Sequence, residues 1–397
     1  MTQAIETERS ALSRKWLVSL IGIVWAGVLA FALAGFSQAG LLPEGPDEWT
    51  YDWRTLLFSP TADGPRKDIA VVVIDDDSMA DYDYVSPIDR GFMATLVRAL
   101  DAAEPRAIGL DFIYDRKSEP DKTEALIGAI HDVKAPIVFG AVDLRIRSLQ
   151  KDNLNYQEDF IAKTGREAGH VFFARDVQKL TIADQVVRYM GERAPAPPDR
   201  KSLAQLLAEK SGGIPSEPET PYITWLLAPG SSDLFPLFRV PRHEPGSGPD
   251  VILPASWRAA LKDRVVLVGG AFRDRDRHLT PLSIWDGQKI PGVLIQAQIL
   301  AQLLDGRSIH EIGWMSELIL LAAVAFLGFL CGQQQRLKRY DWLLYFLGLA
   351  ALILAGIVLF WGYSVIIPST TLFFAWTLGI TGGHYARGGL QRLQFAK

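Results

Sequence analysis

The chain has 397 residues, of which 49% are hydrophobic, and it carries a formal net charge of −4. This length is sufficient for more than one structural unit. The acidic balance argues against nucleic acid as a partner, because phosphate recognition requires a basic surface. The single cysteine, Cys331, excludes an intrachain disulfide.

Hydrophobic residues are concentrated in charge-free runs, which lie at 16–36, 318–335 and 342–383. About 20 apolar residues in a helix cross the hydrocarbon core of a bilayer. The last run is long enough to cross twice, with a turn near Gly362. We therefore predict four transmembrane α-helices, at residues 16–36, 314–332, 342–361 and 365–383.

Basic residues predict how these helices are oriented. Lys and Arg cluster before the first span, between the second and third, and after the fourth. By the positive-inside rule these three regions are cytoplasmic, which makes the protein a multi-pass inner-membrane protein with both termini inside. The predicted remaining segments are a cytoplasmic tail, a periplasmic domain, a cytoplasmic loop and a second cytoplasmic tail, at 1–15, 37–313, 333–341 and 384–397.

The first span has a competing interpretation as a cleaved signal peptide. Residues 32–34 read Ala-Leu-Ala and are followed by Gly35, which resembles a signal-peptidase site. The apolar run is longer than a typical signal-peptide core, and this favours an uncleaved anchor.

The periplasmic segment alternates between strand-like and helix-like patterns. Residues 47–58 mix aromatic and charged residues, which is typical of a helix lying above the membrane or packed on the domain. Short apolar runs indicate buried strands, and longer amphipathic runs indicate helices. The strands are expected at 70–74, 107–111, 137–140 and 264–270, and the helices at 89–103, 125–133 and 292–304. This alternation predicts an α/β domain with a mixed, largely parallel sheet.

Three carboxylates, Asp75, Asp76 and Asp77, directly follow the first strand. Open α/β sheets bind ligands at the carboxyl ends of their strands, and clustered carboxylates suit hard cations. The D-x-D pattern also resembles the haloacid dehalogenase nucleophile, although Met79 stands where that motif has Thr or Val. Neighbouring strand residues point to opposite faces, so the three acids converge only if a turn intervenes. A structural turn is the main interpretation, with a ligand or metal edge and catalysis as alternatives.

Further polar residues are expected near the same edge of the sheet. Asp111 ends the second strand, Asp115 follows it, and Arg90 begins the first helix. Together they are candidates for one polar cluster, which would either bind a ligand or form a buried ion pair that orients loops.

His278 is a separate candidate, because histidine titrates near neutral pH and Asp274 and Asp276 lie in the same loop. A metal site, a proton sensor and a solvated loop histidine are the alternatives. The sequence contains no phosphate-binding loop, nucleophile elbow or zinc-protease motif. We therefore expect no catalytic residue and no cofactor, and the identity of any metal stays open.

Several stretches of the domain, in their order, resemble the CHASE2 family. They are DIAVVVIDDDSM at 68–79, SPIDRGFMATLVRAL at 86–100, AIGLDFIYD at 107–115, GHVFFARD at 169–176, LKDRVVLVGG at 261–270, DRHLTPL at 276–282 and PGVLIQAQILAQLLDGR at 291–307. One span before the domain and three after it also match the family. The resemblance implies an extracytoplasmic sensor module of bacterial signalling proteins, with no enzymatic activity of its own.

Members of this family usually continue into a cytoplasmic cyclase or kinase, whereas only residues 385–397 remain here. We therefore expect a separate membrane or cytoplasmic protein to receive the signal, in addition to the lipid bilayer as a partner. A homodimer is compatible with this organisation, and the ligand is not indicated. The alternatives are a scaffold or assembly subunit without a switch, and a periplasmic phosphohydrolase that uses Asp75.

Overall fold

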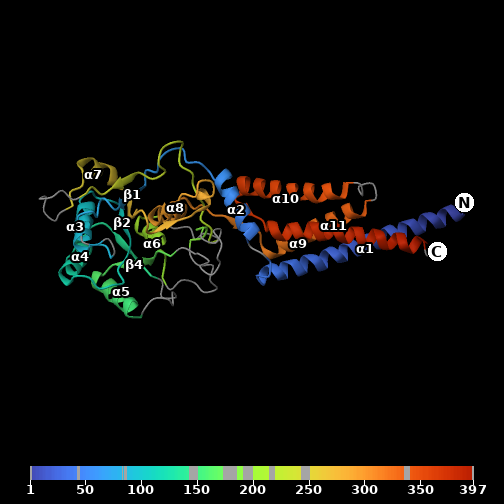
Figure 1. The fold of residues 1–397 in the computed structure, drawn as a ribbon, viewed down its shortest axis with the longest axis horizontal. Coiled ribbons are helices and arrows are strands. Elements are labelled where there is room, and N and C mark those ends of the chain that lie inside the picture. The colour runs from blue at the N-terminus through green and yellow to red at the C-terminus, as the bar shows by residue number, and fades with distance from the viewer. Residues whose placement is uncertain are drawn as a thin grey trace. The chain divides into compact units, whose positions relative to one another are not determined.

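The structure is a computed structural model of the chain, and it divides into two compact units. An α/β unit comprises Ser59–Ile309, and a helical unit comprises Met1–Phe58 and His310–Lys397. Figure 1 shows the sheet and its covering helices in the first unit and long helices in the second. The described residues are 2–42, 45–82, 84, 87–142, 151–172, 186–190, 200–213, 220–242, 251–334 and 340–395.

A six-stranded sheet in the order β4-β3-β2-β6-β1-β5 forms the centre of the α/β unit. Its strands are β1 (Ile69–Ile74), β2 (Ala107–Ile113), β3 (Ile137–Ala141), β4 (Glu167–His170), β5 (Leu237–Arg239) and β6 (Val265–Gly270). All pairings between these strands are parallel. Every residue of β1 and of β6 is buried, which is why both read as unbroken apolar runs.

Helices cover both faces of the sheet (Figure 1). Side chains alternate along β1, so Val72 contributes to one apolar core and Val71 to the other. The first core is formed with α3 (Arg90–Asp101), α4 (Pro120–Asp132), α5 (Lys151–Thr164) and α7 (Ala255–Leu261). The second is formed with α6 (Leu203–Lys210) and α8 (Gly292–Asp305). The short elements β7 (Arg277–His278), η2 (Pro281–Ser283) and β8 (Ile290–Pro291) precede α8.

The helical unit contains three segments that are long and apolar enough to cross a membrane, among the residues described. They are Trp16–Gln38, Trp314–Gln333 and Trp342–Tyr363, close to the predicted spans at 16–36, 314–332 and 342–361. They belong to α1 (Thr2–Gln38), α9 (Trp314–Gln333) and α10 (Asp341–Tyr363). The unit also contains α2 (Gly45–Phe58), β9 (His310–Glu311), β10 (Val365–Ile366) and α11 (Ser369–Phe395).

The fourth predicted span, 365–383, corresponds to α11 and begins later than expected. Val365 and Ile366 form β10 and pair with β9, so the helix starts at Ser369. Polar and small residues recur along α11, among them Thr381, Gly382 and His384, and they lower its mean hydropathy relative to the other three helices. By length and composition, α11 is therefore not among the candidate spans.

Glycine residues allow α9 and α11 to pack with their backbones in contact. A Cβ atom added at Gly332 would lie 2.2 Å from the carbonyl oxygen of Ile380. A Cβ atom at Gly383 would lie 2.2 Å from the carbonyl oxygen of Phe329. Gly328 and Gly332 are four residues apart on α9, as Gly379 and Gly383 are on α11. Such small residues are the usual means of close helix packing in membranes.

The α2 helix packs within the helical unit. The Asp47 carboxylate accepts a hydrogen bond from the backbone nitrogen of Thr370, at 2.9 Å, in the first turn of α11. The ring of Tyr51 meets that of Phe360 on α10 edge to face, with centroids 6.2 Å apart. The compact α/β unit is thus shorter at both ends than the predicted periplasmic segment 37–313.

Substituting leucine for Gly332 should destabilise the helical unit by about 1–3 kcal/mol, the usual cost of overpacking. Thermal unfolding of the full chain in detergent measures the effect. Gly35→Leu in α1 is the matched control, because a Cβ atom there meets nothing within 4 Å. Equal losses in the two variants would contradict the close packing of α9 on α11.

Candidate functional site

The acidic run after β1 forms a tight turn at the carboxyl edge of the sheet. Asp75 Oδ1 accepts a hydrogen bond from the Ser78 backbone nitrogen at 3.0 Å and lies 2.9 Å from Ser78 Oγ. Ser78 Oγ is also 2.7 Å from the carbonyl oxygen of Val240, beyond the end of β5. Burial raises the pKa of Asp75, but the bonds from Ser78 and the charge of Arg239 lower it below its ordinary value.

Arginine side chains pair with the acids along this edge. Arg239 Nη1 lies 3.1 Å from Asp75 Oδ2, and the Arg273 backbone nitrogen donates to Asp76 Oδ2 at 3.1 Å. Arg242 holds Asp81 through two hydrogen bonds of 2.6 and 2.8 Å. The Asp81 carboxylate raises the pKa of Arg242, and the negative charge of the exposed Asp77 raises it further. The described part of the chain contains no group of three or more His, Cys, Asp or Glu that could hold a metal ion.

Arg90 does not join Asp111 and Asp115 in one cluster. It is 1% exposed and lies over the rings of Tyr114, Tyr156 and Phe160, at 5.3–5.8 Å from their centroids. Its Nη1 atom donates to the hydroxyl groups of Thr123 and Tyr156, at 2.8 and 2.5 Å, and its Nη2 atom donates to the carbonyl oxygen of Arg116. No described carboxylate lies within ion-pair distance of this guanidinium. Arg90 therefore joins α3, α4 and α5 in the first core.

Strand alternation explains why Asp111 lies elsewhere. Leu110 points into the first core, so Asp111 is directed toward the opposite face, where α8 packs. It pairs with Gly269 on β6, and a Cβ atom at Gly269 would touch Val293 of α8. Asp115 Oδ1 lies 3.9 Å from Nε of its neighbour Arg116. The predicted cluster of Arg90, Asp111 and Asp115 is thus not formed.

A different group of side chains gathers where α8 begins. His278 is 7% exposed, and its Nε2 atom lies 2.8 Å from Asp276 Oδ1. Asp276 has a positive φ of 49°, and its carboxylate occupies the space that a Cβ atom of Gly292 would need. Burial raises the pKa of Asp111 well above its ordinary value, and the Asp276 charge raises it further. These three titratable groups come from β2 and from the loop between β6 and α8.

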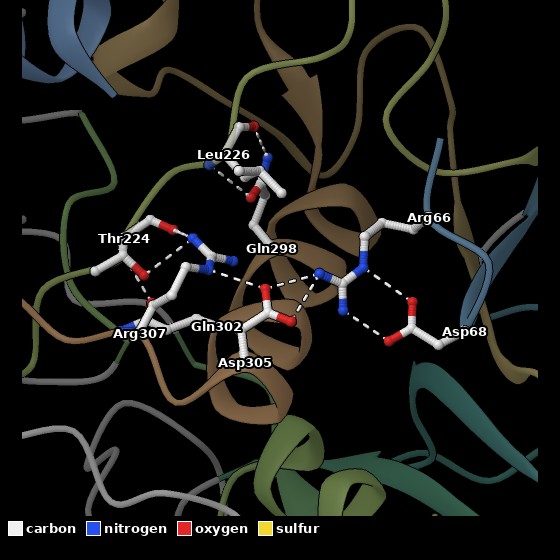
Figure 2. A network of polar contacts seen from close by, with 8 residues as sticks. All are labelled: Arg66, Asp68, Thr224, Leu226, Gln298, Gln302, Asp305 and Arg307. Atoms are coloured by element: carbon white, nitrogen blue, oxygen red, sulfur yellow. Dashed lines mark hydrogen bonds and ion pairs between the residues drawn. The ribbon is translucent and has the colours of Figure 1, made fainter. Parts of the chain in front are cut away.

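A second polar network lies at the other end of α8, near the start of β1 (Figure 2). Arg66 donates two hydrogen bonds to Asp68, at 2.9 and 2.6 Å. Its Nη1 atom also lies 2.8 and 2.7 Å from the two oxygens of Asp305. Asp305 accepts a further bond of 3.0 Å from Arg307, whose Nη1 atom donates to the carbonyl oxygen of Thr224 at 2.5 Å.

Two glutamines on one side of α8 extend this network. Gln298 donates to the carbonyl oxygen of Leu226 at 2.9 Å and accepts from its backbone nitrogen at 3.2 Å. Gln302 accepts from the Thr224 backbone nitrogen at 2.7 Å and donates to the carbonyl oxygen of Tyr222 at 3.1 Å. Their side chains bind an extended segment as a neighbouring strand would (Figure 2).

The residues of this network are not among those predicted from the sequence. The signals available were an Arg-x-Asp pair immediately before β1 and glutamines spaced four apart on an otherwise apolar helix. A buried glutamine needs partners for both its donor and its acceptor atoms, so such a spacing indicates a hydrogen-bonded neighbour.

The fold defines a class: a parallel α/β domain whose chain runs at both ends into apolar helices. A family model described as the CHASE2 domain matches residues 24–332. The chain therefore belongs to the CHASE2 family, an extracytoplasmic sensor domain of membrane signalling proteins, as the resemblance indicated. No curated protein and no solved structure matches it.

Replacing Arg90 with methionine should lower the free energy of unfolding of the α/β unit by about 3 kcal/mol. The hydroxyl groups of Thr123 and Tyr156 and the Arg116 carbonyl would lose a buried donor. Urea denaturation of the full chain in detergent measures this. Arg242→Met removes an exposed arginine and should change the free energy of unfolding little. An equally small change in Arg90→Met would mean that the contacts of Arg90 with Thr123, Tyr156 and Arg116 do not stabilise the fold.

Asp111→Asn should stabilise the protein at neutral pH. Because the pKa of Asp111 is raised on folding, the folded state holds its proton more tightly than the unfolded state, whose pKa is near 3.8. Stability is then greatest below that value and falls as the pH rises through the raised pKa. Melting temperatures at pH 7.5 should differ between variant and wild type, and they should converge near pH 3.5. Asp77→Asn is the matched control: because the Asp77 side chain is exposed, the variant should have the same melting temperature as the wild type at pH 7.5.

Proposed function

We propose that this protein is a multi-pass inner-membrane sensor whose extracytoplasmic α/β unit detects a ligand or partner and relays the event to a separate cytoplasmic effector. One observation carries the proposal. The sensor domain of the CHASE2 family is joined at both of its ends to helices that are apolar enough to span a membrane. Any change in this domain that displaces its ends is passed along the chain, to α1 through α2 and to α9 through β9.

The proposed topology has four spans, with both termini in the cytoplasm. The packing of α11 supports its inclusion, because its backbone touches that of α9 at Gly332 and Gly383. A helix in such contact with a membrane span shares the environment of that span. The basic residues in the N-terminal part of α1 ahead of Trp16, between α9 and α10, and in the C-terminal part of α11 then lie on the cytoplasmic side.

The exit from the α/β unit offers a route for the signal. β9 follows that unit directly and pairs in parallel with β10, which connects α10 to α11. The His310 backbone nitrogen donates to the Ser364 carbonyl oxygen at 2.8 Å. A displacement of β9 would therefore reach α9 through the chain and α10 and α11 through these hydrogen bonds.

The carboxyl edge of the sheet is the proposed sensing region. It carries six of the candidate residues, namely Asp75, Asp76, Asp77, Asp111, Asp115 and His278, while Arg90 orients the loops beneath it. The alternating acids and arginines suit a polar ligand or a polar protein surface better than an apolar one. A homodimer, in which a second copy provides this surface, is one form of such a partner.

A scaffold without a switch is the second candidate function, and the same ion pairs favour it. Asp75, Asp76 and Asp81 already have arginine partners, as expected for a static rim. A phosphohydrolase is less well supported, because Asp75 is engaged by Ser78 and the side chain of Met79 is buried.

Complementation of a deletion strain separates the two functions. If the protein is a sensor, the double variant Asp75→Ala, Asp111→Ala should reach the membrane at normal levels and retain its binding partner. It should also lose the change in gene expression or phosphorylation that distinguishes wild type from the deletion strain. A scaffold should retain both the partner and the output. Absence of any partner or output for the wild-type chain would contradict both functions.

A further inference from the structure

The two ends of the α/β unit meet at one side chain. The chain enters this unit at Ser59 and reaches β1 through Arg66 and Asp68, and it leaves the unit through Asp305 and Ile309. Arg66 bonds to Asp68 on the entering segment and to Asp305 on the leaving segment (Figure 2). A single guanidinium thus joins segments that are 239 residues apart in the sequence.

The surroundings of this contact favour a strong interaction. The Arg66 side chain is 15% exposed and that of Asp305 is 29% exposed, so water screens the pair only in part. Arg66 holds Asp68 in the parallel two-bond geometry that makes arginine–carboxylate pairs both strong and directional. Burial by itself would lower the pKa of Arg66, but the hydrogen bonds and charges of Asp68 and Asp305 raise it above its ordinary value.

Additional bonds fix the leaving segment to the rest of the unit. Arg307 connects Asp305 to Thr224, and the hydroxyl group of Thr220 donates to the Ile309 carbonyl oxygen at 2.7 Å. The 222–227 segment in turn pairs with the entering segment, where the Ala62 nitrogen donates to the Leu227 carbonyl oxygen at 3.0 Å.

The α8 helix connects this network to the proposed sensing edge. It is 14 residues long, which corresponds to about 21 Å, and nearly all of its residues are buried. Its first residue, Gly292, lies against Asp276, and its last residue is Asp305. A buried helix of this length transmits a displacement at one end to the other, because the close-packed core leaves little room for compression.

We propose that Arg66 locks the entering and leaving segments of the α/β unit together, so that a displacement of α8 moves both membrane connections as one body. This inference deepens the proposed sensor function and rests on it for its biological meaning. Arg66 is here a positioning residue, and its partner at the end of α8 is Asp305. Loss of this contact would let the leaving segment move independently of the entering one.

Spin labels on the full chain in lipid nanodiscs test this inference. Labels at Asp63→Cys and Ser308→Cys, in a Cys331→Ser background, report the separation of the two segments. Arg66→Lys keeps the positive charge but cannot bond to both carboxylates with the same geometry. It should broaden the distance distribution between the labels. Arg242→Lys makes the same chemical change at the two-bond pair with Asp81 and should leave the distribution narrow.

Hydrogen exchange supplies a second measurement without labels. Amide exchange across 62–68 and 305–309 should be roughly tenfold faster in Arg66→Lys and in the near-isosteric Asp305→Asn, with no change at β1 or β6. Exchange that is accelerated throughout the α/β unit would indicate general destabilisation and would overturn the lock. Identical label distributions in Arg66→Lys and Arg242→Lys would also overturn it. Both measurements report on structure alone. If they contradict the lock while the protein still signals, the proposed function is unaffected.

Discussion

The arrangement of the α/β unit depends on the burial of β1 and β6 side by side, with helices over both faces of the sheet. Neither strand has an exposed residue, so neither face offers a place for charge. Charged residues therefore lie in the segments that flank these strands, at the two ends of the sheet, where hydrogen-bond partners are available. The carboxyl end has the aspartates, arginines and His278, and the amino end has Arg66 and its network.

The sequence was sufficient to predict the features that depend on local composition. The unbroken apolar runs of β1 and β6 and the charge-free stretches of α1, α9 and α10 were all identifiable without the structure. α11 was harder to assess, because its backbone contacts with α9 use glycines, and glycine adds little to mean hydropathy. The packing of α11 depends on contacts with α9, and the mean hydropathy of one segment does not include contacts with another.

For the candidate site, the sequence predicted which edge of the sheet carries the residues, but not which of their side chains contact one another. The turn at Asp75 was expected from strand alternation. The same alternation directs Asp111 away from the first core, which contains Arg90, whereas the prediction placed these two residues in one cluster. Arg90 begins a helix whose apolar side faces the first core, so its side chain enters a cage of aromatic rings from three separate segments. The pairing of Arg66 with Asp305 brings together residues from opposite ends of the domain, and no local pattern encodes such a distance.

The adjoining ends of the α/β unit have a consequence for the evolution of the protein. A domain whose entering and leaving segments lie side by side, as they do at Arg66 and Asp305, can be inserted into a loop of another protein without stretching its host. The loop between two membrane helices is such a host, and it needs to supply only two short connections. The geometry of the unit is therefore compatible with gain or loss by recombination. Insertion would place the unit between two membrane helices of another protein, and removal would leave a short loop.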